Sequence, residues 1–346
     1  MKTSVQRTAF PWQLRRAALS AVVVVVVIAL GLWYFRSSDT RLTMVPKILA
    51  PFPAGHSHRL PKTPRSVVIV VEENKSYKQI FGDADSSPYL NALAKEGAVF
   101  TRSFGVAHPS QPNYFAMFSG QTNKNGDSCS VREIARDADN LGAELLAAHR
   151  IFRAYVEDLP RPGFTGCSSG QYARKHAPWT HFTNVPAQDA VPFSELTSYD
   201  TLPDVAFVIP NLVHDMHSAS IESGDAWLHD HIAPLVVWAK GHNALVVITW
   251  DESSSPVTNH IPTLFVGPMV KPGRYDEVIS HSNLLRTVED LFGLRHAGSA
   301  ATASPILDCW TSSAATAIEV RHGVRRFAWG KVRDLTVVKL AANLNR

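Results

Sequence analysis

Val67-Val68-Ile69-Val70-Val71-Glu72-Glu73-Asn74 is a continuous β-branched run that ends in two carboxylates and an amide. An uninterrupted apolar run of this kind predicts a strand that is buried on both faces of a parallel sheet. In open sheets of parallel strands, ligands gather beyond the carboxyl ends of the strands. The run therefore predicts both a central strand and the edge of a functional site.

The same type of strand recurs along the chain and alternates with amphipathic segments. Further strands are predicted at 99–104, 152–156, 205–209, 244–250 and 262–266, and helices at 88–95, 114–118, 140–149, 226–239 and 282–292. This alternation favours an α/β fold with a mostly parallel, helix-covered sheet. Residues 157–199 are rich in Pro, Gly, Ser and aromatic residues, which predicts long loops over a site.

Five polar segments lie beside these apolar runs. They are Glu73-Asn74, His108-Pro109-Ser110, the run from Asn211 to His217, Asp251-Glu252 and Asn259-His260. Only the last of them precedes its strand. Carboxylate and amide oxygens suit Mg²⁺, Ca²⁺ or Mn²⁺, and histidines bind phosphate or a softer metal. Their recurrence at strand ends favours a metal-assisted phosphate-ester site over a set of solvated strand ends.

Ser110 is predicted to lie near the start of a short helix, between two prolines. A hydroxyl held there beside a cation could attack phosphorus, although taken alone such a serine is an ordinary helix cap. His214 and His217 could contact phosphate oxygens or protonate a leaving alkoxide, with Asp215 orienting one of them. The remaining candidates are interpreted as surface or scaffold residues: His149, His176, His229, His231 and His242.

The amino terminus predicts a membrane anchor. Residues 1–16 are basic, and residues 17–35 are uncharged, include six consecutive valines and are about as long as a membrane-spanning helix. The basic flank favours a cytoplasmic amino terminus and an extracytoplasmic remainder. A cleavable signal peptide, and hence secretion, is the alternative.

The rest of the chain is predicted to contain one catalytic domain. A Pro-rich spacer at 36–65 precedes this domain at 66–310, and a tail follows at 311–346. From Glu319 to Arg346 there are seven basic and two acidic residues, typical of a solvated tail or a lipid-surface contact. Outside the first 35 residues, 30 basic side chains balance 30 acidic ones, which argues against a nucleic-acid partner.

Three cysteines in an extracytoplasmic chain suggest one disulfide and one remaining thiol. Cys129 and Cys167 lie in loop-like surroundings, so we predict that they pair and that Cys309 stays free. Three buried free thiols are the alternative.

Several motifs together resemble the bacterial phosphoesterase family, which includes acid phosphatases, phosphatidylinositol-3-phosphatase-like enzymes and, more distantly, phospholipases C. The resemblance covers roughly residues 66–300. The motifs are Glu72–Tyr77, His108–Tyr114, Phe118–Gly120, Gly163–Cys167, Ile209–Asn211, His214–His217, Thr249–Glu252, Ile261–Pro268 and Ser280–Thr287. Two positions depart from the family pattern, because Lys75 stands where histidine is frequent and Val213 where a small residue is common.

The resemblance implies an alkaline-phosphatase-like three-layer α/β sandwich that uses one divalent metal ion of unknown identity. It implies that Glu73, Asn74, Asp251 and Glu252 are metal-site residues and that Ser110 is a nucleophile that also touches the metal. The residues implied to surround the phosphoryl group are His108, Asn211, His214, His260 and His281.

These observations predict a membrane-anchored, extracytoplasmic acid phosphatase that hydrolyses phosphomonoesters, with phosphorylated lipids and inositols, such as phosphatidylinositol 3-phosphate, among the candidate substrates. A phospholipase C-type phosphodiesterase is the nearest alternative, since it would use the same site. An envelope protein that binds a phosphorylated ligand without catalysis is the second. Turnover of a phosphomonoester would separate both alternatives from the main hypothesis.

Overall fold

The computed structural model describes residues 59–124, 126–255 and 257–311. The predicted anchor at 17–35 and the predicted tail lie outside these residues. Within the described part, no helix is both long enough and apolar enough to cross a membrane.

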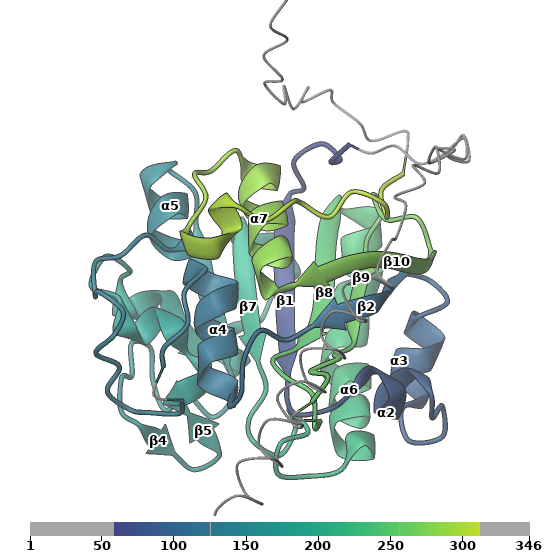
Figure 1. Ribbon diagram of the computed structural model, residues 1–346, viewed down its shortest axis with the longest axis horizontal. Helices are drawn as coiled ribbons and strands as arrows, with labels where there is room; N and C mark the ends of the chain where they lie inside the picture. Colours follow the sequence, from purple (N-terminus) through teal and green to yellow (C-terminus); the bar gives the residue numbers. More distant parts are fainter. Residues whose placement is uncertain (1–58, 125, 256, 312–346) are drawn as a thin grey trace, which may run out of the picture. The chain divides into compact units, whose positions relative to one another are not determined.

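An eight-stranded sheet forms the centre of the described part (Figure 1). Its strands are β1 (Ser66–Glu72), β2 (Ala98–Phe104), β3 (Phe152–Val156), β6 (Ala190–Pro192), β7 (Val205–Ile209), β8 (Ala244–Trp250), β9 (Thr263–Val266) and β10 (Gly273–Ser280). Their order is β10-β2-β9-β8-β1-β7-β3-β6. Every pairing is parallel except those of β9 with β2 and β8. The predicted mostly parallel α/β fold is therefore confirmed.

Helices cover both faces of this sheet. They are α2 (Tyr77–Phe81), α3 (Pro88–Leu93), α4 (Ser110–Ser119), α5 (Leu141–Ala147), α6 (Ile221–Gly241) and α7 (His281–Phe292). Side chains alternate along β1, so Ile69 packs with residues of α4, α5 and α7, while Val68 and Val70 pack with residues of α2, α3 and α6. Figure 1 shows α7 in front of β1 and α4 beside β7, with α5 farther to the left. β1 is buried on both faces as its sequence predicts.

The antiparallel direction of β9 explains the one polar segment that precedes its strand. β8 ends at Trp250, and the chain returns through β9 from the same edge of the sheet. His260 forms a bridge with Phe104, the last residue of β2, and the Asn259 carbonyl accepts a hydrogen bond from the Gly105 amide at 2.9 Å. Asn259-His260 therefore lies at the carboxyl edge with the other four segments.

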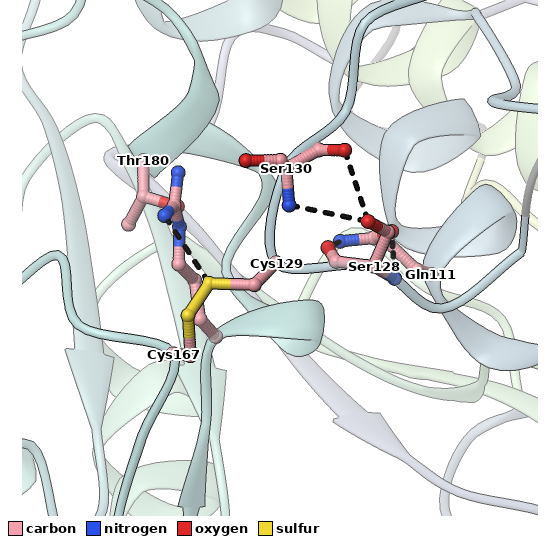
Figure 2. Close-up of a disulfide and its surroundings, with 7 residues drawn as sticks. Gln111, Ser128, Cys129, Ser130, Cys167 and Thr180 are labelled. Atoms are coloured by element: carbon pink, nitrogen blue, oxygen red, sulfur yellow. Dashed lines mark hydrogen bonds between the residues drawn. A yellow bond between two sulfur atoms is a disulfide. The ribbon is translucent and has the colours of Figure 1, made fainter.

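Short elements fill the loop region that the sequence predicts between β3 and β7. They are β4 (Ser168–Ser169), β5 (Tyr172–Ala173) and the 3₁₀ turns Arg174–His176, Pro178–His181, Ala187–Asp189, Phe193–Glu195 and Tyr199–Thr201; a further 3₁₀ turn, Gly298–Ala301, follows α7. Cys129 and Cys167 form a disulfide that joins this region to the loop after α4, as predicted, and Cys309 is free and buried (Figure 2).

Candidate active site

Four residues that directly follow two adjacent strands form the floor of the site; three are buried and Asn74 is half-buried. Glu73 and Asn74 follow β1, and Asp251 and Glu252 follow β8, the strand that pairs with β1 along its length. The Asp251 amide donates to the Glu72 carbonyl at 3.0 Å, which continues the ladder to the point where the side chains diverge. The Asn74 amide then donates to Asp251 Oδ1 at 3.2 Å.

Ser110 is the first residue of α4 and is buried. Its hydroxyl donates to Glu73 Oε2 at 2.9 Å and lies 3.5 Å from Glu252 Oε1. Asn74 Nδ2 donates to the same Glu73 oxygen at 3.1 Å. The structure therefore brings the predicted nucleophile into direct contact with Glu73 and Glu252, and Glu73 in turn contacts Asn74.

His108 lies at the mouth of this group and is about one-third exposed. Its Nδ1 is 2.5 Å from Glu252 Oε2. The position is fixed on the other side by Asn113 of α4, whose side chain accepts from the Val106 amide at 2.9 Å and from the Ala107 amide at 3.0 Å. His108 is therefore a polar group at the border between the buried carboxylates and solvent.

His176 belongs to the centre of the site, in contrast to its interpretation above as a surface or scaffold residue. Its ring is buried and stacks on Tyr114, with ring centroids 4.7 Å apart. Nε2 lies 2.7 Å from Glu73 Oε1, and Nδ1 lies 3.5 Å from Asp215 Oδ2. Because residues 157–199 carry no periodic pattern, the sequence did not indicate that one of their histidines enters the core.

One nitrogen or oxygen from each of Glu73, His176 and Asp215 can be chosen so that all three atoms lie within 4.8 Å of one another. Glu73 Oε1, His176 Nε2 and Asp215 Oδ2 are buried and have no hydrogen-bond partner of good geometry. Buried carboxylates are costly unless they are paired or bind a metal. Two carboxylates and one imidazole at this spacing fit a bound cation. Asp251 Oδ2 is also buried without a hydrogen-bond partner.

Charge and burial oppose each other among these carboxyl groups. Burial raises the pKa of Asp251 well above its usual value, and the neighbouring Glu73 and Glu252 raise it further. Burial and Glu73 likewise raise the pKa of Glu252 to about 7. Burial also acts to raise the pKa of Glu73, but the charge and hydrogen bond of His176 lower it to about 2. Without a cation, the site holds more carboxyl groups than it can keep ionised together.

Asn211 and His214 follow β7 and are held by carboxylates at the end of β3. The Asn211 amide donates to Glu157 Oε2 at 2.9 Å, and His214 Nδ1 lies 2.9 Å from Glu157 Oε1. Trp227 of α6 donates its indole N–H to the same Glu157 oxygen at 3.1 Å and stacks on the His214 ring. Glu157 was not predicted as a site residue. It directly follows the predicted strand 152–156, and this position could have identified it.

The three other predicted histidines have different surroundings. His217 has its ring centroid 6.5 Å from that of His176, at the edge of the metal-ligand set. His260 lies 3.0 Å from the Thr101 carbonyl through Nε2 and stacks on Tyr77. His281 is buried with Nε2 2.6 Å from the Asp251 carbonyl, and burial lowers its pKa to about 4. His281 thus contacts the floor of the site directly, whereas His260 contacts Thr101 and Tyr77.

Known proteins resemble this chain in sequence and in fold. The model of the phosphoesterase family matches residues 83–295. Over 248 residues the chain is 49% identical to the phosphatidylinositol-3-phosphatase of Mycobacterium tuberculosis, covering 70% of this chain and 82% of that protein. Over 231 residues it is 28% identical to the phosphate-repressible acid phosphatase of Penicillium chrysogenum, covering 60% of this chain and 55% of that one.

Among solved structures, the chain resembles a protein of the alkaline phosphatase superfamily from Vibrio parahaemolyticus. The TM-score is 0.50 at 15% identity, and the match covers 75% of this chain and 74% of the other. At this identity the likeness concerns the fold alone.

Proposed function

The chain belongs to the phosphoesterase family, and from this we propose that it is a metal-assisted phosphomonoesterase in which the Ser110 hydroxyl attacks phosphorus. That it is a hydrolase of phosphoric monoesters follows from its phosphatase relatives. One observation carries the assignment of the nucleophile: Ser110 Oγ is buried at the start of α4, within hydrogen-bonding distance of two carboxylates.

The residues proposed to hold the metal beside Ser110 are Glu73, Asn74, Asp251 and Glu252. The buried Asp251 Oδ2, which has no hydrogen-bond partner, supports this assignment. An all-oxygen set suits Mg²⁺, Ca²⁺ or Mn²⁺. When bound, a divalent cation supplies Lewis-acid stabilisation of the phosphoryl oxygens and favours ionisation of the serine.

The protein's own groups are proposed to act in a displacement with a phosphoserine intermediate. The oxygen of Ser110 forms a bond to phosphorus as the bond from phosphorus to the leaving oxygen breaks. His214 is proposed to protonate that leaving oxygen, because Glu157 holds its Nδ1 side and fixes the ring orientation. Water then hydrolyses the phosphoserine and restores Ser110.

The nucleophile is tested on the full chain with p-nitrophenyl phosphate. Ser110→Ala is expected to lower kcat by about 10³-fold or more. Ser119→Ala is the matched control, since Ser119 is a buried serine at the other end of α4 that bonds only to the Phe115 carbonyl within the described part. Acid quenching during turnover should trap a phosphate on the peptide that contains Ser110. Full activity of Ser110→Ala would disprove the assignment.

The role of His214 is tested by varying the leaving group. His214→Gln should slow hydrolysis of an alkyl phosphate by about 10²-fold or more, and should slow p-nitrophenyl phosphate much less, because p-nitrophenolate needs little protonation. An equal loss on both substrates would assign His214 to phosphate binding instead of proton transfer.

We propose that the natural substrate is a phosphorylated lipid or inositol, on the basis of the relative that is named a phosphatidylinositol-3-phosphatase. Release of inorganic phosphate from phosphatidylinositol 3-phosphate, compared with soluble inositol phosphates, tests this. Release of diacylglycerol from phosphatidylcholine would instead indicate a phospholipase C-type enzyme.

We also propose that residues 17–35 anchor the chain with the catalytic domain outside the cytoplasm, as their composition predicts. Protease digestion of intact spheroplasts tests the orientation, because an outward domain is cleaved while a cytoplasmic one is protected. Recovery of the protein in the soluble fraction with a new amino terminus would show cleavage.

A further inference from the structure

We propose that the opening of the active site docks on the surface of an anionic lipid bilayer through two loops, residues 105–109 and 257–260, which we call the mouth loops. This rests on the phosphorylated-lipid substrate proposed above and extends it to the way in which the enzyme reaches that substrate. A phosphorylated lipid presents its headgroup at the bilayer surface, so the opening of the site has to approach that surface.

The mouth loops are joined to each other and to the site. The Gly105 amide donates to the Asn259 carbonyl at 2.9 Å, and Asn259 Nδ2 donates to the Ala107 carbonyl at 2.9 Å. Asn259 Oδ1 also accepts, at 2.8 Å, from the amide that directly follows Glu252. His108, in the first mouth loop, contacts the Glu252 carboxylate. Both loops therefore border the opening of the site.

Each mouth loop exposes an apolar side chain. Val257 is 88% exposed, the largest value among the exposed large apolar side chains of the described residues, and Val106 is 40% exposed. Pro109, directly before Ser110, is also exposed. Single exposed apolar side chains are common on protein surfaces, but these three lie on two joined loops beside one site. Their grouping indicates an apolar contact surface.

The backbone at the two valines suits an apolar environment. The Val106 amide donates to Asn113 Oδ1 at 2.9 Å, and the Val257 amide donates to Ser255 Oγ at 3.4 Å. A backbone amide that enters the apolar part of a bilayer without a partner is costly. Because both amides are bonded within the protein, the valine side chains can enter the bilayer surface without carrying an unpaired donor with them.

Cationic side chains lie beside each mouth loop. Tyr77 of α2 stacks on His260, and its hydroxyl accepts a hydrogen bond at 2.6 Å from Arg274, which is exposed. Lys124 is exposed in the segment whose Gly126 packs against the first mouth loop. Lysine and arginine are attracted to the negative potential of an anionic bilayer. The combination of apolar and cationic groups thus complements an anionic bilayer.

The first experiment compares a substrate in a bilayer with one in solution. The full chain is reconstituted in vesicles of phosphatidylcholine and phosphatidylserine that contain phosphatidylinositol 3-phosphate, and p-nitrophenyl phosphate is assayed with the same vesicles. Val257→Ser and Val106→Ser should each lower kcat/KM for the lipid by about 10-fold, the effect of losing one inserted apolar side chain. Activity on p-nitrophenyl phosphate should stay unchanged.

Val237→Ser is the matched control and should change neither activity. Val237 is 73% exposed, and it lies near the end of α6, which leads into the start of β8 at the opposite edge of the sheet.

The outcomes separate this proposal from the proposed function. Wild-type activity of both mouth-loop variants on the lipid would overturn the bilayer contact and leave the phosphatase in place. An equal loss on both substrates would also overturn it, because the valines would then support the site itself. A wild type that is inactive on both substrates would refute the proposed function, and direct insertion would then decide the bilayer contact.

Insertion is measured without turnover. Val257→Cys is labelled with a nitrobenzoxadiazole fluorophore in the reconstituted full chain; Cys309 is buried and the other two cysteines form a disulfide, so the label attaches at position 257. A blue shift and quenching by spin-labelled lipid are expected, and Val237→Cys should show neither. A label at position 257 that is quenched by aqueous iodide but not by spin-labelled lipid would overturn the proposal.

The preference for an anionic surface is tested with Lys124→Gln and Arg274→Gln. Each should lower the ratio of lipid turnover in phosphatidylserine-containing vesicles to that in phosphatidylcholine vesicles by about 5-fold, given the attraction of one cation to such a surface. Lys240→Gln, in the last turn of α6, is the control and should not change the ratio. An unchanged ratio in both variants would overturn the anionic surface as the partner.

Discussion

Asn74 shows how the backbone and the side chain of one residue serve the site separately. Its φ of +55° lies in the left-handed region, where asparagine is tolerated and most other residues are not. The turn lets its amide reach Asp251 while its side chain reaches Glu73. Backbone conformation and side-chain chemistry can therefore be separated by substitution.

Asn74→Gly should keep the turn and lose the amide, so the free energy of unfolding changes little while kcat/KM falls by about 10–100-fold. Asn74→Ala should show the same loss of activity and in addition lose about 1–2 kcal/mol of stability, because alanine is strained at this φ. Urea unfolding and phosphatase assays measure the two effects. A fully active Asn74→Gly variant would show that the side-chain amide is not needed.

The sequence predicts the residues at strand ends because each one terminates an apolar run. Glu73 and Asp251 could be found in this way, and the structure places them on adjacent strands. Glu157 also directly follows a predicted strand, so the same pattern was sufficient to identify it as a candidate site residue. His176 could not be found, since its position depends on the tertiary path of an irregular segment.

At the level of elements, the end of α4 shows how tightly this helix is held. Gly120 ends the helix with φ +63°, and a Cβ there would lie 2.3 Å from the Ala297 carbonyl oxygen. Gly293 ends α7 with φ +66°, but a Cβ there would meet no atom within 4 Å. The two glycines have the same conformation and differ only in crowding.

Gly293→Ala should cost about 1 kcal/mol, the strain of a left-handed alanine. Gly120→Ala should cost about 2 kcal/mol or more beyond that, because the segment 297–299 must move. Chemical denaturation of both variants gives the difference directly. Equal losses of stability in the two variants would mean that residues 297–299 move at no cost in free energy.

The disulfide supports the segment that carries His176. The Arg174 amide donates to the Cys167 carbonyl at 3.0 Å, and the Arg174 side chain bonds to Thr180 and approaches Cys129 Sγ. Lys175 pairs with Asp127, whose other oxygen accepts from the Gln111 amide beside Ser110. The disulfide thus joins the loop after α4, which contacts the residue next to Ser110, to the segment that carries His176.

Replacing both Cys129 and Cys167 by serine should lower the free energy of unfolding by about 3–4 kcal/mol, given the 38-residue separation. Phosphatase activity below the unfolding temperature should also fall, because Lys175 and His176 lose their support. Cys309→Ser is the control, since this buried thiol has no disulfide partner. Unchanged activity in the double variant would show that the loops hold the site without the bridge.

Within the described sheet, the sequence does not reveal the two edge strands, β10 and the short β6. The β10 residues Gly273–Ser280 include three charged side chains, and only Tyr275 and Ile279 are buried, because β10 lies at an edge of the sheet. A search for continuous apolar runs detects central strands and misses such an edge. α2 is missed for a related reason, since its five residues are too few for a periodic pattern.

For the molecule as a whole, a pair of buried carboxyl groups away from the active site makes stability depend on pH. Burial raises the pKa of Glu289 to about 8 and that of Glu144 to about 7, from an ordinary value of 4.5. The folded state therefore retains protons that the unfolded state releases. The free energy of unfolding should fall as pH rises from about 4.5 through 8, by up to about 1.4 kcal/mol per pH unit for each group.

Glu289→Gln should remove one of these contributions while Oε1 continues to accept from the Ala297 amide. The variant should be more stable than wild type at about pH 9 and close to wild type at about pH 5. Thermal unfolding at the two pH values measures this. Glu222→Gln, at an exposed position of α6, is the control and should leave the dependence unchanged. An equal change in stability at both pH values would show that titration of Glu289 does not contribute to the pH dependence.

The order of strands in the sheet also determines when strands can pair during synthesis of the chain. Within the described sheet, β1, β2 and β3 do not pair with one another; β1 pairs with β7 and β8, β2 with β9 and β10, and β3 with β6 and β7. A nascent chain that ends at Val156 has made three apolar strands and none of their partners. Pairing at such long separation is slow, and the sheet is complete only after β8, β9 and β10 have been synthesised in the last third of the chain. Asp251 and Glu252 also lie in that last third, so the proposed site cannot form while the chain is still short.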